Sequence, residues 1–125
     1  MYPYDQTVNP PAPRVPVRIS HPVTNFFAEA MGFLDTGASA TVVPQEIINQ
    51  LGLREVGANT LLGIERSPIV VANYQARLEV AWIRLGVLTV AGANFPHILL
   101  GRDVLNQFDI TLRGKAQEVE MVPAR

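Results

Sequence analysis

The fold-deciding stretch of the chain is Met31-Gly32-Phe33-Leu34-Asp35-Thr36-Gly37-Ala38-Ser39-Ala40-Thr41-Val42-Val43. The apolar residues before Asp35 predict the end of a buried strand, and the β-branched residues from Thr41 onward predict the start of another. Between them, Gly37 allows a sharp turn that holds Asp35 at the bend. A carboxylate between two apolar strands costs free energy unless it is hydrogen-bonded or takes part in chemistry. Asp35 is therefore the first candidate functional residue.

A second stretch changes the interpretation of Asp35-Thr36-Gly37, which on its own is a weak signal because all three residue types are common in turns. Residues 98–108 contain another predicted apolar strand, which ends in glycine, and a short helical pattern directly after it. Residues 44–52 also have the pattern of a short helix, with proline at the start and glycine just past the end. Strand, glycine-containing turn and short helix thus occur twice, which indicates an internal duplication of architecture.

The composition bounds the fold and excludes several classes of function. The chain has 125 residues, 48% of them hydrophobic, which suits one domain with a modest core. Its net charge of −1 gives no electrostatic footprint for nucleic acid or an anionic membrane. Cysteine is absent, which excludes disulfides, thiolate metal sites and cysteine nucleophiles. No signal peptide is recognisable and no stretch approaches the roughly 20 apolar residues that span a bilayer, so we expect a soluble protein, with a cytoplasmic location slightly favoured.

Periodicity along the chain predicts mostly strands. Residues 1–14 are expected to be a proline-rich arm, and residues 15–125 the domain. Apolar and polar residues alternate from Val15 to Ile19, which predicts a half-buried strand whose partner, after a turn at 21–25, delivers the carboxylate. A strand-rich run is predicted over 69–85, with Trp82 on the same face as Val80 and a break at Gly86. A terminal strand is predicted over 119–122.

In this order and in so short a chain, the two glycine-containing turns resemble those of the retropepsin-like aspartic proteases. The resemblance runs from about Val15 to about Leu112, and its specific parts are residues 35–39 and residues 99–103. It implies an all-β fold with one or two short helices, arranged as a closed barrel. It also implies that the second half carries no catalytic Asp, because Leu99-Leu100-Gly101 stands where the first half has Asp-Thr-Gly.

The resemblance further implies which residues form the site. Asp35, Thr36 and Gly37 would be the catalytic group, with Thr36 hydrogen-bonding across a subunit interface. Ala38 and Ser39 would lie beside the backbone of the substrate.

A β-hairpin over residues 60–68 is expected to act as a flap that folds over the substrate, with its tip near Gly63. Leu62 and Ile64 would either cover an apolar side chain of the substrate or pack on neighbouring strands. These two roles are equally compatible with the sequence.

Peptide hydrolysis by carboxylates requires two of them that share one proton. One acts as a base on the attacking water, while the protonated one polarises the scissile carbonyl. This chain has one Asp-Thr-Gly, so the second carboxylate must come from another copy and a twofold homodimer becomes part of the mechanism. We expect an aspartic endopeptidase that hydrolyses a peptide or protein between apolar side chains in mild acid, with no metal or organic cofactor.

Other polar residues fit ordinary structural roles. Asp103 stands at a predicted helix start, where we expect it to cap the helix. Some family members pair the arginine at the position of Arg102 with an acid shortly after Asp-Thr-Gly, but Ser39 or Ala40 stands there, so Arg102 must find another partner. The two histidines, at positions 21 and 97, lack metal-ligand spacing and are expected to be loop residues.

A function of a different class remains open from the sequence. A dimeric module could keep this fold and hold a peptide without cutting it. The intact Asp-Thr-Gly argues against that hypothesis, because a non-catalytic descendant has no need for a buried acid.

Overall fold

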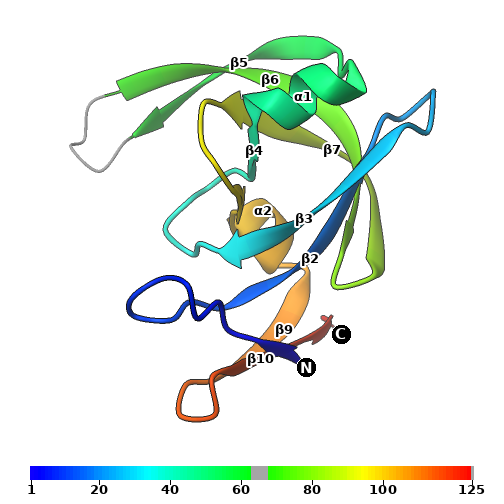
Figure 1. Cartoon of the computed structure of the whole chain (residues 1–125). Helices are drawn as coiled ribbons and strands as arrows, with labels where there is room; N and C mark the ends of the chain where they lie inside the picture. Colours follow the sequence, from blue (N-terminus) through cyan, green and yellow to red (C-terminus); the bar gives the residue numbers. More distant parts are fainter. Residues whose placement is uncertain (63–67, 125) are drawn as a thin grey trace.

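The computed structural model of the chain describes residues 1–62 and 68–124, and Figure 1 shows their arrangement. The described part consists mainly of strands, with two short helices. In chain order the elements are β1 (Tyr2–Pro3), β2 (Arg14–Ser20), β3 (Phe27–Leu34), β4 (Val42–Pro44), α1 (Gln45–Leu51), β5 (Glu55–Leu62), β6 (Pro68–Val80), β7 (Ile83–Ala93), β8 (Ile98–Leu100), α2 (Arg102–Leu105), β9 (Phe108–Arg113) and β10 (Glu118–Pro123).

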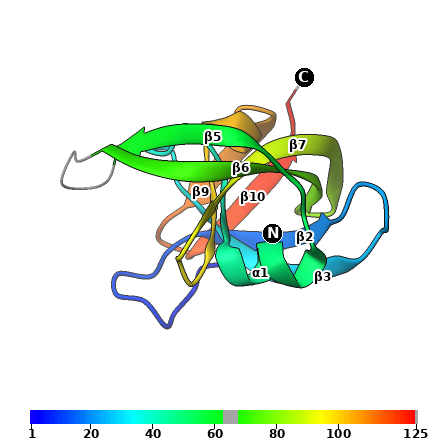
Figure 2. The same cartoon turned by 90° about the horizontal axis from the view of Figure 1, so that it is seen from above.

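The larger sheet closes on itself. Its strands follow the order β2-β3-β8-β4-β7-β6-β5. An additional pairing of β2 with β6 closes the first six of these strands into a barrel. The closing register runs from Val17 opposite Val80 to Ser20 opposite Arg77. Strand β5 stays outside the closed barrel and pairs only with the first part of β6, so these two strands form a hairpin that extends beyond the barrel (Figure 2). The predicted all-β closed barrel is confirmed.

Alternate residues of each strand fill the barrel. On β2, Val15, Val17 and Ile19 are at most 1% exposed, as the predicted alternation required. Burying such a side chain stabilises the fold by about 1.5–3 kcal/mol relative to leaving it in water. These three side chains belong to one core, to which most other strands and both helices also contribute. Its further members include Val43, Ile48, Ala76, Leu78, Val80, Val90, Ile98, Leu100 and Val104.

Both short helices lie where the sequence predicts them. Helix α1 begins directly after Pro44 and ends at Gly52, whose φ of +64° is the left-handed conformation that glycine adopts most readily. Its Ile48 and Leu51 are buried against the barrel. Helix α2 follows β8 and buries Val104 and Leu105.

The prediction that Trp82 lies on the same face as Val80 in one long strand is wrong. Strand β6 ends at Val80, and the chain reverses through Ala81 and Trp82, whose φ angles are +50° and +63°, into β7. Two consecutive positive φ angles match the twist of a tight hairpin, and they leave the indole 52% exposed. Gly86 does not end the strand but lies within β7, beside a register shift between Leu78 and Glu79.

Strands β1, β10 and β9 form a separate three-stranded sheet below the barrel in Figure 1. Strand β10 contains the terminal strand predicted over 119–122, and it pairs antiparallel with β9 from Glu118 opposite Arg113 to Pro123 opposite Phe108. On its other side, β10 pairs with β1, with Tyr2 opposite Val119. The first and last strands are thus paired within one chain.

Residues 5–13, which connect β1 to β2, are anchored by a buried carboxylate. The side chain of Asp5 is 3% exposed, and its Oδ1 accepts hydrogen bonds from the backbone N (2.9 Å) and the hydroxyl (2.6 Å) of Thr7. Its Oδ2 lies 3.3 Å from Nη1 of Arg14. The hydrogen bonds from Thr7, together with the charges of Arg14 and His97, hold the pKa of Asp5 below its ordinary value. The expectation that residues 1–14 are an arm apart from the domain stays a prediction.

This anchor predicts a stability that depends on pH. Because folding lowers the pKa of Asp5, the ionised carboxylate stabilises the fold above its ordinary pKa, and this contribution disappears as the pH falls through the lowered value. We expect Asp5→Asn to lower Tm near neutral pH, and we expect its difference from wild type to shrink as the pH falls through the lowered pKa of the Asp5 carboxyl. Thermal unfolding monitored by circular dichroism at a series of pH values measures this. A Tm difference that stays constant as the pH is lowered into the acid range would contradict the ionic role.

Candidate active site

Strand β3 delivers Asp35 to the start of a short loop. The backbone N of Asp35 donates to the carbonyl O of Leu100 (3.0 Å), which ties the loop to the end of β8. The backbone N of Gly37 donates to Oδ1 of Asp35 (3.0 Å), and the N of Ala38 donates to its carbonyl O (3.2 Å). The turn predicted at Gly37 is therefore present, and it orients a carboxylate that is only partly buried.

The start of α2 clamps this loop from the other half of the chain. The backbone N of Arg102 donates to the carbonyl O of Ala38 (2.9 Å), and Nη1 of its guanidinium donates to the carbonyl O of Thr36 (2.8 Å). The missing acid partner of Arg102 is thus replaced by a backbone carbonyl. At Gly101 the backbone passes so close to Ala40 that a Cβ atom would lie 2.6 Å from the carbonyl C of Ala40. The second glycine-containing turn holds the first one in place.

A buried hydrogen-bonded group completes the clamp. Thr41 is fully buried, and its hydroxyl donates to Oδ1 of Asp103 (2.8 Å) while its backbone N donates to Oδ2 (3.1 Å). The same hydroxyl oxygen accepts from the N of Gly101 (3.1 Å). The expectation that Asp103 caps the helix holds only in part: Gly101 is the N-cap residue, but Oδ1 of Asp103 also accepts from the backbone N of Val104 (2.8 Å) in the first turn of α2. Sequence periodicity marks Thr41 as the start of a buried strand but gives no sign of its partner.

Thr41→Val is expected to destabilise the fold by about 2–3 kcal/mol, because the valine keeps the shape but removes a hydrogen bond to Oδ1 of Asp103 and leaves the buried N of Gly101 unsatisfied. Chemical denaturation monitored by fluorescence measures the free energy of unfolding. Thr89→Val, at an exposed position of β7, is the matched control and should change stability by less than about 0.5 kcal/mol. Equal effects of the two substitutions would contradict the role of the hydroxyl.

The remaining predicted site residues are only partly placed. Ser39 is exposed on the loop, and Ala38 is partly buried. Gly63 and Ile64 lie outside the described residues. Leu62 ends β5, and the two arms of the predicted flap are paired up to Leu62 opposite Pro68. Figures 1 and 2 both show this hairpin extending on the side of the barrel where the loop after β3 lies.

Apolar side chains beside Asp35 were not identified from the sequence as site residues. Phe33 and Leu99 are opposite each other in the β3–β8 ladder, and alternation turns both away from the barrel core. The imidazole of His97 lies edge-on to the ring of Phe33, with 5.0 Å between ring centroids. Leu99 also packs against a second, smaller apolar cluster made of Val42, Val71 and Ala91. The alternation of side chains along a strand could have identified Phe33, because it places the Phe33 side chain on the opposite face from that of Leu34.

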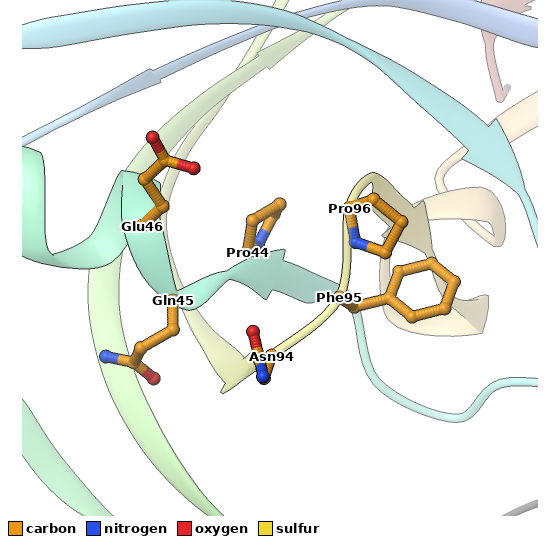
Figure 3. Close-up of a pocket in the computed structure, with 6 residues that line it drawn as sticks. All are labelled: Pro44, Gln45, Glu46, Asn94, Phe95 and Pro96. Atoms are coloured by element: carbon orange, nitrogen blue, oxygen red, sulfur yellow. The ribbon is translucent and has the colours of Figure 1, made fainter.

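One hollow in the structure is lined by none of the predicted site residues. This hollow lies between residues 44–46 and residues 94–96, and in Figure 3 Pro44 and Pro96 face each other across it while the ring of Phe95 points away. Among the described residues, no group of three or more His, Cys, Asp or Glu side chains is placed to bind a metal ion. No helix in the described part of the chain is long and apolar enough to cross a membrane.

Comparisons with known proteins agree with this geometry. The model of the family described as retroviral aspartyl protease matches residues 9–113. The structure of the EIAV protease complexed with the inhibitor HBY-793 superposes with a TM-score of 0.62 at 21% identity, over 76% of this chain and 86% of that one. The solution structure of the simian foamy virus (mac) protease gives a TM-score of 0.54 at 16% identity, over 74% of this chain and 91% of that one.

A longer protein also contains the fold. The foamy viral protease-reverse transcriptase in complex with an RNA/DNA hybrid gives a TM-score of 0.60 at 15% identity, covering 91% of this chain and 13% of that one. No curated protein is significantly similar in sequence. At such identities the structural matches show the fold, and the family model covers most of the chain. The chain therefore belongs to the retroviral aspartyl protease family, as the resemblance of its two glycine-containing turns implied.

Proposed function

We propose that the chain is an aspartic endopeptidase whose catalytic centre consists of two Asp35 side chains, one from each subunit of a homodimer. One observation carries this proposal. A partly exposed carboxylate, oriented by the backbone N of Gly37, stands on a loop that β8 and α2 hold rigidly. Membership of the family supports the reaction class, and the single Asp-Thr-Gly in the sequence supports the need for a second copy.

The chemistry follows from placing two carboxylates side by side. Both cannot be ionised cheaply at short distance, so the pair holds one proton and titrates as a unit. The ionised Asp35 takes a proton from a water molecule while the water oxygen attacks the carbonyl carbon of the substrate. The protonated Asp35 of the other subunit donates to the carbonyl oxygen. A tetrahedral intermediate results. When the carbon–nitrogen bond breaks, the leaving nitrogen takes up a proton from the pair. The carbonyl forms again as one hydroxyl of the intermediate returns a proton to the pair.

The neighbours of Asp35 supply the positioning in this proposal. Thr36 hydrogen-bonds across the interface and stiffens the site, and Gly37 offers backbone groups to the substrate. Ala38 and Ser39 lie beside the substrate backbone. Clamping of the loop by Arg102 supports these roles, because reacting atoms must be held to a fraction of an ångström.

The hairpin of β5 and β6 is proposed to cover the bound peptide, with Leu62, Gly63 and Ile64 at or near its tip. Its arms expose apolar side chains that a folded surface ordinarily buries: Val56 is 44%, Ile69 is 53% and Val70 is 73% exposed. Ile69 lies on the same face of β6 as the buried Val71, where a bound peptide would cover it, whereas Val70 lies on the opposite face.

The substrate is proposed to be an extended peptide with apolar side chains around the cleaved bond. Phe33 and Leu99 present an apolar surface two residues before Asp35 and on the neighbouring strand. Leu99 also packs against the small apolar cluster of Val42, Val71 and Ala91, which extends this surface. Desolvating an apolar side chain against these residues would supply binding free energy of about 25 cal/mol per Å².

Digestion of an unfolded protein mixture tests the proposal. The chain is incubated with the mixture from about pH 4 to about pH 8 at several enzyme concentrations, and mass spectrometry maps the cuts. We expect cuts between apolar residues, greatest activity in mild acid, and a specific activity that rises with enzyme concentration because only the dimer is complete. A folded dimer that makes no cuts under any of these conditions would favour the non-catalytic peptide-binding module instead.

A further inference from the structure

The turn between β2 and β3 (Figure 1) is held by one nitrogen atom of a histidine ring. The backbone N of Val23 donates to Nδ1 of His21 (3.0 Å), and the backbone N of Thr24 donates to the same atom (3.1 Å). Within the described part of the chain, these two backbone groups donate to no other acceptor. The imidazole therefore takes the place that the side-chain oxygen of asparagine, aspartate or serine ordinarily has in such a turn.

These two contacts determine the protonation state of the ring. A ring nitrogen that accepts hydrogen bonds carries no proton, so the proton of the neutral imidazole must be on Nε2 of His21. Turning the ring over would set the carbon Cδ2 against both N–H groups, and this carbon is no acceptor. The turn therefore requires an uncharged His21.

The remaining contacts of the turn join three strands. The backbone N of His21 donates to the carbonyl O of Phe26 (2.8 Å), and the N of Asn25 donates to the carbonyl O of His21 (3.3 Å). From β6, Nη1 of Arg77 donates to Oδ1 of Asn25 (3.2 Å), and its Nη2 donates to the carbonyl O of Pro22 (3.3 Å). The turn thus connects β2 and β3 with each other and with β6.

No carboxylate among the described residues forms an ion pair with His21. The charged side chains of the strands on both sides of the turn are paired with one another, and these pairs are Arg18 with Glu29 (2.7 Å) and Arg84 with Glu79 (3.6 Å). The charged group that contacts the turn is the guanidinium of Arg77, which is itself a cation. A proton on the imidazole would therefore add a second positive charge to this turn without a compensating acid.

We propose that His21 makes the β2–β3 turn a pH-sensitive switch, which is closed while the imidazole is neutral and opens when Nδ1 takes up a proton. A protonated Nδ1 is a donor and points its hydrogen at the N–H groups of Val23 and Thr24, so repulsion replaces both hydrogen bonds. Histidine side chains ordinarily change charge between about pH 5 and about pH 8. The two bonds therefore stabilise the turn in neutral and alkaline solution, and their contribution is lost as the pH falls through this range.

Opening of the turn affects the pairing that closes the barrel. The β2–β6 register ends with Ser20 opposite Arg77, directly before His21. Little burial keeps the tip closed, because Val23 is 82% and Phe26 is 65% exposed. We expect the turn and this last pair to open locally in mild acid while the rest of the barrel stays folded. The proposed protease is most active in the same pH range, but the switch requires no catalytic group.

Hydrogen exchange of single backbone amides, followed by NMR, tests the switch. In wild type, the protection factors of the Val23 and Thr24 amides, corrected for the intrinsic effect of pH, should fall about tenfold or more from about pH 8 to about pH 5. In His21→Asn, Oδ1 occupies the position of Nδ1 and does not titrate, so the protection should stay constant over this range. His21→Ala has no acceptor, and its two amides should be unprotected at every pH.

His97→Asn is the matched control, because it removes the other histidine by the same substitution and should keep the wild-type pH dependence at the turn. Nitrogen NMR of the wild-type His21 ring requires no variant, and near neutral pH it should show a bare Nδ1 and a protonated Nε2. The Tm of each variant near neutral pH verifies that it folds.

Constant protection of the two amides in wild type, an equal fall in His21→Asn, or a proton on Nδ1 near neutral pH overturns the proposal. None of these readouts uses cleavage of a substrate. Failure of the switch therefore leaves the proposed function intact, and a chain without protease activity would still show the switch.

Discussion

Asp35→Asn is expected to remove peptide cleavage, with kcat/KM lowered by at least about 10³-fold, while the fold and the dimer persist. The amide oxygen of asparagine can still accept the hydrogen bond from the backbone N of Gly37, so the turn keeps its shape. An amide cannot take a proton from water at these pH values, and a pair of amides cannot share one. The substitution therefore separates chemistry from structure.

The comparison uses the mass-mapped digestion described above, with wild type and Asp35→Asn at equal dimer concentration. Glu46→Gln, at an exposed position of α1, removes one carboxylate elsewhere and should keep full activity. Mixing wild type with an excess of Asp35→Asn should also inhibit wild type, because most wild-type chains then enter mixed dimers with only one carboxylate. Cleavage at wild-type rates by Asp35→Asn would show that Asp35 is not catalytic.

Gly101→Ala is expected to be the most destabilising single-methyl addition near the site. The new Cβ would lie 2.6, 2.7 and 3.0 Å from the carbonyl C, the O and the N of Ala40, and these are backbone atoms that cannot rotate away. The φ of −84° at Gly101 is open to any residue, so the cost comes from overlap and not from torsion. We expect a loss of about 3 kcal/mol or more in the free energy of unfolding.

Activity should fall together with stability in this variant, because relief of the overlap must move the loop that carries Asp35 away from α2. Chemical denaturation gives the free energy of unfolding, and kcat/KM is measured where the variant is still folded. Gly114→Ala is the control, since nothing lies within 4 Å of its added Cβ. A Gly101→Ala protein as stable and as active as Gly114→Ala would mean that the two turns do not press on each other as tightly as the structure indicates.

Features that depend on neighbours along the chain could be predicted from the sequence. Alternation identified the buried face of β2, and Pro44 with Gly52 bounded α1 to within one residue at its start. The Asp-Thr-Gly turn and its apolar flanks located Asp35 at the end of β3. These predictions succeed because strand period, helix ends and turn preference are properties of a few consecutive residues.

Local patterns failed where a contact between distant segments decided the outcome. No residue type that favours positive φ marks the turn at Ala81 and Trp82, where the backbone N of Ala81 donates to the carbonyl O of Pro16 (2.9 Å). Asp103 has the appearance of a helix cap, yet it also bonds Thr41, 62 residues earlier in the chain.

The sequence by itself determined the fold class, the family and the position of the carboxylate that the proposed chemistry uses. Only the tertiary structure decided how the loop of Asp35 is held by Arg102 and Asp103, and that β10 pairs with both β1 and β9 within one chain. The physical reason is that hydrogen bonds and strand pairing between remote segments depend on how the closed barrel brings its two halves together, and a one-dimensional pattern contains no record of those distances.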